Sequence, residues 1–140
     1  MTLMVTFKID AIPQGKARPR FARMGNFVKT YTEAKTKVYE EYVALCARRA
    51  MGASEPLKTP LEAFIYISMP IPTSFSKKRK EACLNNIEKP TKKPDIDNVC
   101  KGIFDAMNKI VYVDDTQIIA LHATKVYGEP YVEVLIREAE

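Results

Sequence analysis

Four stretches of the chain alternate between apolar and polar residues with a period of two, or are apolar and rich in β-branched and aromatic residues. Pro13 and Pro70 follow the first and the second of them, and the tripeptide Gly128-Glu129-Pro130 separates the last two. The last two stretches are therefore expected to pair as a hairpin. The predicted strands are 3–12, 61–69, 117–127 and 131–137, with a short fifth strand at 110–113.

Three other stretches predict helices. The first begins at Glu33 after Thr32 as its N-cap and ends at Met51 before Gly52. A basic helix begins at Lys77 after Ser74 or Ser76 and runs to about Asn86, and a third spans 95–108 after Pro94. The apolar arc of the first helix contains Val38, Tyr39, Tyr42, Val43, Leu45, Cys46 and Ala50. This order of elements predicts a mixed α/β (α+β) fold, a single domain over residues 1–140 with a largely antiparallel sheet and helices on one face.

Composition and charge narrow the class of protein. The 140 residues are 46% hydrophobic and 28% charged, which is typical of a folded domain. The net charge of +5 favours an anionic partner, nucleic acid first. His122 is the single histidine, so metal sites that need two histidines are excluded.

The cysteines and the hydropathy indicate in which cellular compartment the protein is expected. Cys46, Cys83 and Cys100 are odd in number and have no C-x-x-C spacing, which favours a reducing environment. No signal-like segment is visible, and no apolar stretch has the roughly 20 residues that a spanning helix needs. We expect a cytoplasmic protein that does not contact membranes.

Acidic residues gather in one part of this basic chain: five aspartates lie between residues 95 and 115. Asp95 and Asp97 open the third predicted helix, where carboxylates also serve as caps, and Asp114 and Asp115 lie in a turn. If the two pairs converge, a cation must neutralise them, and an oxygen-only ligand set favours Mg²⁺, with Mn²⁺ as a substitute. We interpret Asp105 as a residue that supports the structure.

Lys101 lies one helical turn from Asp97, on the same polar face. An ordinary i, i+4 salt bridge is one interpretation of this pair. The other is chemical: phosphodiester hydrolysis needs positive charge beside the metal to stabilise the phosphoryl oxygens.

The acidic segment resembles the signature of the RusA-type Holliday-junction resolvases, approximately K/R-P/R-D-x-D-N-x-x-K-x-x-x-D-A-L/M-N and then D-D-x-Q-V/I. The matching residues are Lys93-Pro94-Asp95-Ile96-Asp97-Asn98-Val99-Cys100-Lys101-Gly102-Ile103-Phe104-Asp105-Ala106-Met107-Asn108 and Val113-Asp114-Asp115-Thr116-Gln117-Ile118. The early Gly15-Lys16-Ala17-Arg18-Pro19-Arg20-Phe21 is similar to that of phage-associated members, and the similarity extends over most of the chain.

This resemblance implies a RusA-like fold and a homodimeric, Mg²⁺-dependent endodeoxyribonuclease. It also implies a bacterial cell as the setting, with a phage or prophage as one source of the gene. Its substrate would be the four-way DNA junction, cut by paired symmetric incisions during recombination and repair. By motif position the catalytic residues are Asp95, Asp97, Lys101 and Asp115, and the metal ligands are Asp95, Asp97, Asp114 and Asp115. The chain differs from the best-known member in Lys93-Pro94 and in a spacer before Asp114 that is one residue shorter.

Basic residues offer surfaces for the DNA backbone. Lys16, Arg18, Arg20 and Arg23 alternate with aromatic residues near the N-terminus, while Lys92 and Lys93 directly precede the acidic motif. We expect all six to bind DNA phosphates. The run Lys77–Lys80 has the composition of an ordinary solvated face, and its role is open.

Other classes of protein fit less well. A PD-(D/E)xK nuclease needs Glu-x-Lys after its first aspartate, but Glu33-Ala34-Lys35 lies upstream of Asp95. A small-molecule phosphotransferase would need a Gly-rich phosphate loop, which is missing, so we expect no nucleotide cofactor. A phage accessory protein that binds branched DNA without cutting it stays an alternative, and it predicts DNA binding that a chelator does not affect.

Overall fold

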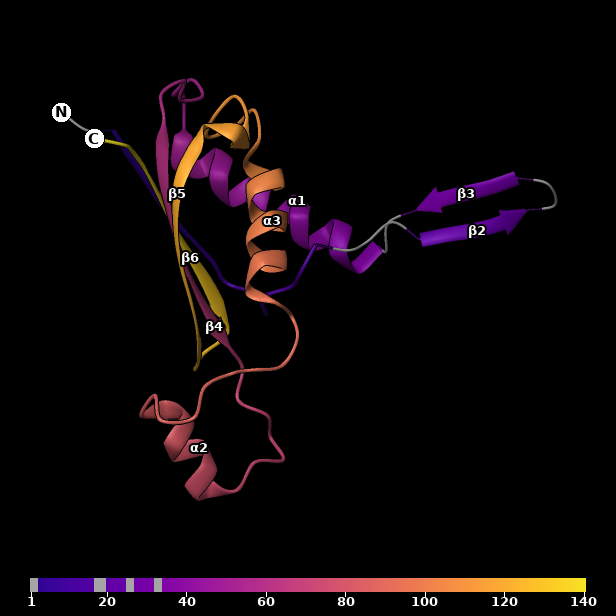
Figure 1. Cartoon of the computed structure of the whole chain (residues 1–140), viewed down its shortest axis with the longest axis vertical. Coiled ribbons are helices and arrows are strands. Elements are labelled where there is room, and N and C mark those ends of the chain that lie inside the picture. The colour runs from indigo at the N-terminus through magenta and orange to yellow at the C-terminus, as the bar shows by residue number, and fades with distance from the viewer. Residues whose placement is uncertain (1–2, 17–19, 25–26, 32–33) are drawn as a thin grey trace.

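Four strands form one mixed sheet in the computed structural model of the chain (Figure 1). The structure describes residues 3–16, 20–24, 27–31 and 34–140, and it describes side chains outside 17–33. β6 is antiparallel to both β1 and β4, whereas β4 and β5 are parallel. The order across the sheet is β1 (Met4–Ile9), β6 (Tyr131–Glu138), β4 (Leu61–Met69) and β5 (Ile118–Tyr127).

Two helices cover one face of this sheet, α1 (Ala34–Met51) and α3 (Ile96–Met107) (Figure 1). Their inward residues and the inward residues of the central strands form one apolar core. Each large side chain that it buries stabilises the fold by about 1.5–3 kcal/mol. The fully buried members include Val43, Ile65, Val99, Ile103, Met107, Val132, Val134 and Ile136. The α+β architecture predicted from the sequence is confirmed, with three α-helices among the residues that the structure describes.

The predicted hairpin of the last two strands is wrong. Their register shows that both pair with β4, which lies between them: Phe64 is opposite His122 of β5 on one side and Leu135 of β6 on the other. The chain can place β5 beside β4 because residues 70–117 between them contain two helices, and parallel strands need such a crossover.

Smaller expectations also need correction. Residues 110–113 form no strand, and Tyr112 makes only isolated bridges with Leu57 and Asn108. On α1, Val38 is 64% exposed and Leu45 41% exposed, so the buried arc is narrower than predicted. The predicted N-cap Thr32 and first helical residue Glu33 lie outside the described residues.

The basic N-terminal segment, predicted as a loop, contains a two-stranded antiparallel hairpin. Its strands are β2 (Arg20–Met24) and β3 (Phe27–Tyr31). Figure 1 shows this hairpin projecting away from the helical side of the sheet. Arg20 and Arg23 belong to β2, and Arg18 lies outside the described residues.

α2 (Lys77–Leu84) lies beyond one end of the sheet, apart from α1 and α3 (Figure 1). Ser76 is its N-cap, because its side-chain oxygen accepts a hydrogen bond of 3.2 Å from the Arg79 backbone N–H. This confirms one of the two predicted caps. The helix ends at Leu84, two residues before the predicted end.

Candidate active site

The helix that carries the acidic motif is fixed by its opposite face. Val99, Ile103 and Met107 are completely buried against the core, at the i, i+4 and i+8 spacing of one helix face. Asp97 and Lys101 are therefore turned to the exposed side, one turn apart as predicted. Neither forms an ion pair with another described residue, so the structure gives these two charges no fold-stabilising partner.

Asp95 is the N-cap residue of α3, but its carboxylate makes no capping hydrogen bond. An N-cap aspartate normally uses its side chain for the free N–H groups of the first turn. Asp95 is also exposed to solvent. The capping interpretation of this carboxylate, left open by the sequence, is therefore not what the geometry shows.

Lys125 of β5 holds the loop that leads into α3. Its Nζ donates a hydrogen bond of 2.8 Å to the Lys92 carbonyl and one of 3.0 Å to the Pro94 carbonyl. Pro94 directly precedes Asp95, so Lys125 fixes the backbone from which Asp95 projects. No local sequence pattern indicates this role, because Lys125 belongs to a strand that follows the motif.

A cavity of about 640 Å³ adjoins Asp95. Two lysines line it, Lys93 from the loop and Lys35 from the first turn of α1. Lys35 comes from the Glu-x-Lys tripeptide that lies upstream of Asp95 in the sequence, and the fold brings it to the same cavity as Asp95. The other lining residues are Pro13, Gln14, Gly15, Thr36, Pro94 and Asn98.

The second acidic pair lies at the other end of α3. The Asp115 backbone N–H donates a hydrogen bond of 2.9 Å to Oδ1 of Asn108, the C-cap residue of α3. Asp114 precedes a short 3₁₀ helix (Asp115–Gln117), and its Oδ2 accepts a hydrogen bond of 3.1 Å from the Thr116 hydroxyl. This helix start gives Asp114 a local structural role that the sequence analysis did not foresee.

Burial raises the pKa of Asp115 above its ordinary value, and the neighbouring Asp114 raises it further. A hydrogen bond between the Asn108 and Asp115 side chains lowers this pKa, whereas the charge of Asp105 adds to the rise. Asp105, Asp114 and Asp115 thus share one electrostatic neighbourhood near the C-terminal end of α3.

The two acidic pairs do not converge within one chain. α3 has 12 residues, and at 1.5 Å per residue it separates them by about 18 Å. Among the residues that the structure describes, no three His, Cys, Asp or Glu side chains are grouped closely enough to hold a metal ion. The expected four-carboxylate cluster is therefore absent from the single chain.

Lys16, which the sequence analysis expects to bind DNA, lies between α1 and α3. Its Nζ lies 2.9 Å from Glu40 of α1 and 3.4 Å from Asp105 of α3. Burial lowers the pKa of Lys16, but the contacts with Glu40 and Asp105 outweigh it, so the pKa lies above its ordinary value. Its backbone N–H also donates to the Asn98 carbonyl at 3.1 Å, so Lys16 joins α1 to α3.

Lys92 and Lys93 are exposed, and Lys93 lines the cavity. Gly15 packs against Asn98 so closely that a Cβ there would overlap the Asn98 side-chain amide. This contact fixes the root of the β2–β3 hairpin against the helix that carries Asp97.

The chain is thus a small α+β domain with two exposed carboxylates at the start of α3, and lysines line the cavity beside them. The family model described as Endodeoxyribonuclease RusA matches residues 10–137, and the chain belongs to this family. It is also 38% identical over 138 residues to an uncharacterized protein, YqaN of Bacillus subtilis (strain 168), with 96% of each chain covered. In the described part of the chain, no helix is long and apolar enough to cross a membrane.

Proposed function

We propose that this chain is a Mg²⁺-dependent endodeoxyribonuclease that cuts four-way DNA junctions by paired symmetric incisions, in recombination and repair. Membership of the RusA endodeoxyribonuclease family supports the nuclease class. The observation that carries the proposal is the pair Asp95 and Asp97, exposed at the start of α3 beside a cavity lined by Lys35 and Lys93. Residues 1–140 act as a single RusA-like endonuclease domain.

Asp95 and Asp97 suit a divalent cation. Their oxygens are hard ligands, and the Asp95 carboxylate is not used by the helix that it precedes. Mg²⁺ is the proposed cofactor, with Mn²⁺ as a substitute. When bound, such an ion polarises the phosphoryl oxygens and lowers the pKa of a coordinated water.

The cations around these carboxylates divide the remaining tasks. Lys35 and Lys93 hold the phosphodiester in the cavity, because both line it. Lys101, one turn from Asp97, offers its side-chain nitrogen to the oxygen on which charge develops. The three lysines also offset the repulsion between the carboxylates and the DNA backbone.

We assign Asp114 and Asp115 to the same site through a partner subunit. A two-fold axis perpendicular to α3 sets two copies of this helix antiparallel. The N-terminal end of one copy then meets the C-terminal end of the other, and Asp95 and Asp97 meet Asp114 and Asp115 of the partner subunit. The separation of about 18 Å along a 12-residue helix supports this arrangement, since one ion cannot bridge it. A junction is itself two-fold symmetric, so two such sites give paired incisions.

Phosphate contacts outside the site come from Arg18, Arg20 and Arg23 near the hairpin, together with Lys92 and Lys93. Such contacts provide affinity without sequence information. Lys16 is not among them, because its charge is used by Glu40 and Asp105.

One observation favours a second candidate, a protein that binds branched DNA without cutting it. The four carboxylates do not form a metal-binding group within one chain, as far as the described residues show. This candidate predicts junction binding and no incision at any Mg²⁺ concentration.

The test is incubation with a synthetic four-way junction and with a linear duplex of matched sequence, in Mg²⁺ or in EDTA. The proposal predicts incision of the junction in Mg²⁺, none in EDTA, and little incision of the duplex. Binding without incision in Mg²⁺ would instead support the non-catalytic candidate, and incision in EDTA would contradict the metal requirement.

A further inference from the structure

Charge is distributed unevenly along the chain. Residues 70–94, here called the α2 lobe, contain seven Lys and Arg residues and two Glu residues, for a net charge of +5. The whole chain has the same net charge of +5, so the remaining 115 residues are neutral in sum. The α2 lobe is therefore one of the electropositive segments of the chain.

We propose that the α2 lobe is a second DNA-binding surface, which holds the phosphate backbone of a junction arm through Lys77, Lys78 and Arg79. This inference rests on the proposed function, since it takes the substrate to be DNA. The inference adds a DNA-binding surface that lies outside the acidic motif.

The stability of α2 does not explain why its first residues are basic. α2 begins with Lys77, Lys78, Arg79 and Lys80, and its first turn contains no acidic residue. The N-terminus of a helix carries a partial positive charge, which favours anions and disfavours cations. Lys77 and Lys78 are exposed and form no ion pair with another described residue. Their charge is available to an external anion.

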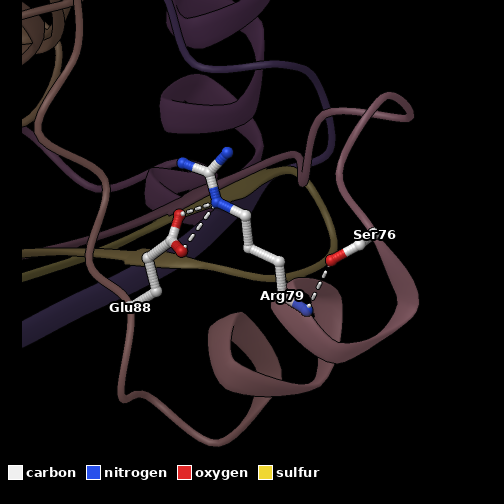
Figure 2. Close-up of polar contacts among 3 residues, drawn as sticks. All are labelled: Ser76, Arg79 and Glu88. Carbon is white, nitrogen blue, oxygen red and sulfur yellow. Dashed lines mark hydrogen bonds and ion pairs between the residues drawn. The ribbon is translucent and has the colours of Figure 1, made fainter.

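Arg79 is held in one orientation (Figure 2). Its Nε donates to both carboxylate oxygens of Glu88, at 2.8 and 3.0 Å, and its Cζ lies 3.5 Å from the centroid of the Phe75 ring. Figure 2 shows the two terminal nitrogens turned away from the Glu88 carboxylate. Because Nε alone makes these hydrogen bonds, the terminal fork is left to bind two phosphate oxygens at little entropic cost.

The α2 lobe is attached to the sheet rather than free to move alone. The Phe75 ring meets Tyr127 of β5 edge to face, with centroids 6.1 Å apart, and Cys83 on the inner side of α2 is buried. The lobe ends at Pro94, one residue before Asp95, and Lys92 and Lys93 continue its charge to the cavity. A DNA strand that enters the cavity thus passes the lobe, which favours DNA over an acidic protein as the partner.

The experiment compares two charge-matched double variants. Lys77→Gln/Lys78→Gln removes two cations from the lobe, and Arg48→Gln/Arg49→Gln removes two from the last turn of α1, where the helix dipole explains them. Junction binding is measured in EDTA over a range of salt concentrations, and the single-turnover incision rate is measured in Mg²⁺ at saturating protein. Thermal melting confirms that both variants fold.

The Lys77/Lys78 variant should bind the junction roughly tenfold more weakly at moderate salt, and its log–log salt slope should fall by about 1.8, since each lost phosphate contact accounts for about 0.9. Its single-turnover rate should match wild type. The Arg48/Arg49 variant should match wild type in all three measurements. If the two variants have the same affinity and slope while wild type cuts the junction, the inference is wrong and the proposed function stands. Wild type that neither binds nor cuts DNA would overturn both.

Discussion

The aspartates near α3 differ in what surrounds each side chain. Asp95 and Asp97 are exposed and have no cation from the described residues against them, whereas Asp105 is paired with Lys16. Asp115 is half-buried beside Asp114 and hydrogen-bonded through its backbone to Asn108. Carboxylates without a structural partner are the ones that a metal ion or substrate can use, which is why the proposed chemistry begins at Asp95 and Asp97.

Asp115 provides a stability test of the site. Its pKa is raised in the folded state, so its ionised form opposes folding once the pH exceeds the ordinary Asp value of about 3.9. Asp115→Asn should therefore raise the melting temperature of the metal-free protein at pH 7 and leave it unchanged well below that value. Melting curves in EDTA at both pH values check this. A lower melting temperature at pH 7 would show that the carboxylate stabilises the fold.

We expect Lys101 to affect the rate of incision and not the affinity for the junction. Lys101→Met removes a charge one turn from Asp97 that forms no ion pair within the described chain. A group that acts mainly as charge develops lowers the rate of the chemical step, here by roughly 10²- to 10³-fold, while the ground-state complex is preserved. Single-turnover rates and junction affinity measured on the same variant separate the two. A variant that loses affinity and keeps its rate would contradict the role.

Some residues of the site were predictable and others were not. The acidic motif and the polar face of α3 follow from spacing alone, because Asp97 and Lys101 are one turn apart on a helix whose apolar residues fix its orientation. The ion pairs of Lys16 with Glu40 and Asp105 depend on how α1 and α3 pack, which local pattern does not contain. The same holds for Lys35, which reaches the Asp95 cavity only through that packing.

At the scale of elements, the loop 92–95 depends on a strand that follows it by about thirty residues. Lys125→Met removes both hydrogen bonds to this loop, at the Lys92 and Pro94 carbonyls. Leaving the partly buried Pro94 carbonyl without this donor costs about 1–3 kcal/mol, and the Asp95 backbone loses its support. We expect an incision rate reduced about tenfold and a higher Mg²⁺ requirement, because a small displacement of the Asp95 carboxylate slows the chemical step.

Lys125→Arg is the matched control, because it keeps the charge and donor groups. It should restore the Mg²⁺ dependence in part. A titration of the rate with Mg²⁺ on both variants is the measurement. If Lys125→Met melts at a lower temperature but keeps the wild-type Mg²⁺ dependence, Lys125 only stabilises the fold.

The pairing of strands shows a limit of sequence patterns at this scale. The strands 118–127 and 131–138 were predicted closely in extent, but their predicted pairing with each other was wrong, because period-two alternation identifies a strand and not its neighbour. The short turn between them favours a hairpin, but β4 is the most apolar strand and takes the central place between them. The two helices within residues 70–117 were predicted from the sequence, and the crossover that they form permits the parallel pairing.

At the scale of the whole molecule, the proposed site needs two chains. Mixing Asp95→Asn with Asp115→Asn protein should restore incision, because one of the two sites in each mixed dimer then contains wild-type Asp95 and wild-type Asp115. With random mixing, half of the dimers are mixed and each has one intact site, so nicking should recover to about a quarter of wild type. Each variant alone should be inactive. If the mixture stays as inactive as its parents, each site is built within one chain or the chains do not exchange.

The central claim is that this chain cuts four-way junctions at symmetric positions with a carboxylate-held metal ion. The most direct measurement places a label on each of the four strands of one junction and maps the incisions made by wild type and by Asp95→Asn in Mg²⁺. Wild type should cut one pair of opposed strands at equivalent positions, and Asp95→Asn should bind the junction with similar affinity and cut no strand. Incisions scattered over all four strands, or the same paired incisions made by Asp95→Asn, would contradict the account.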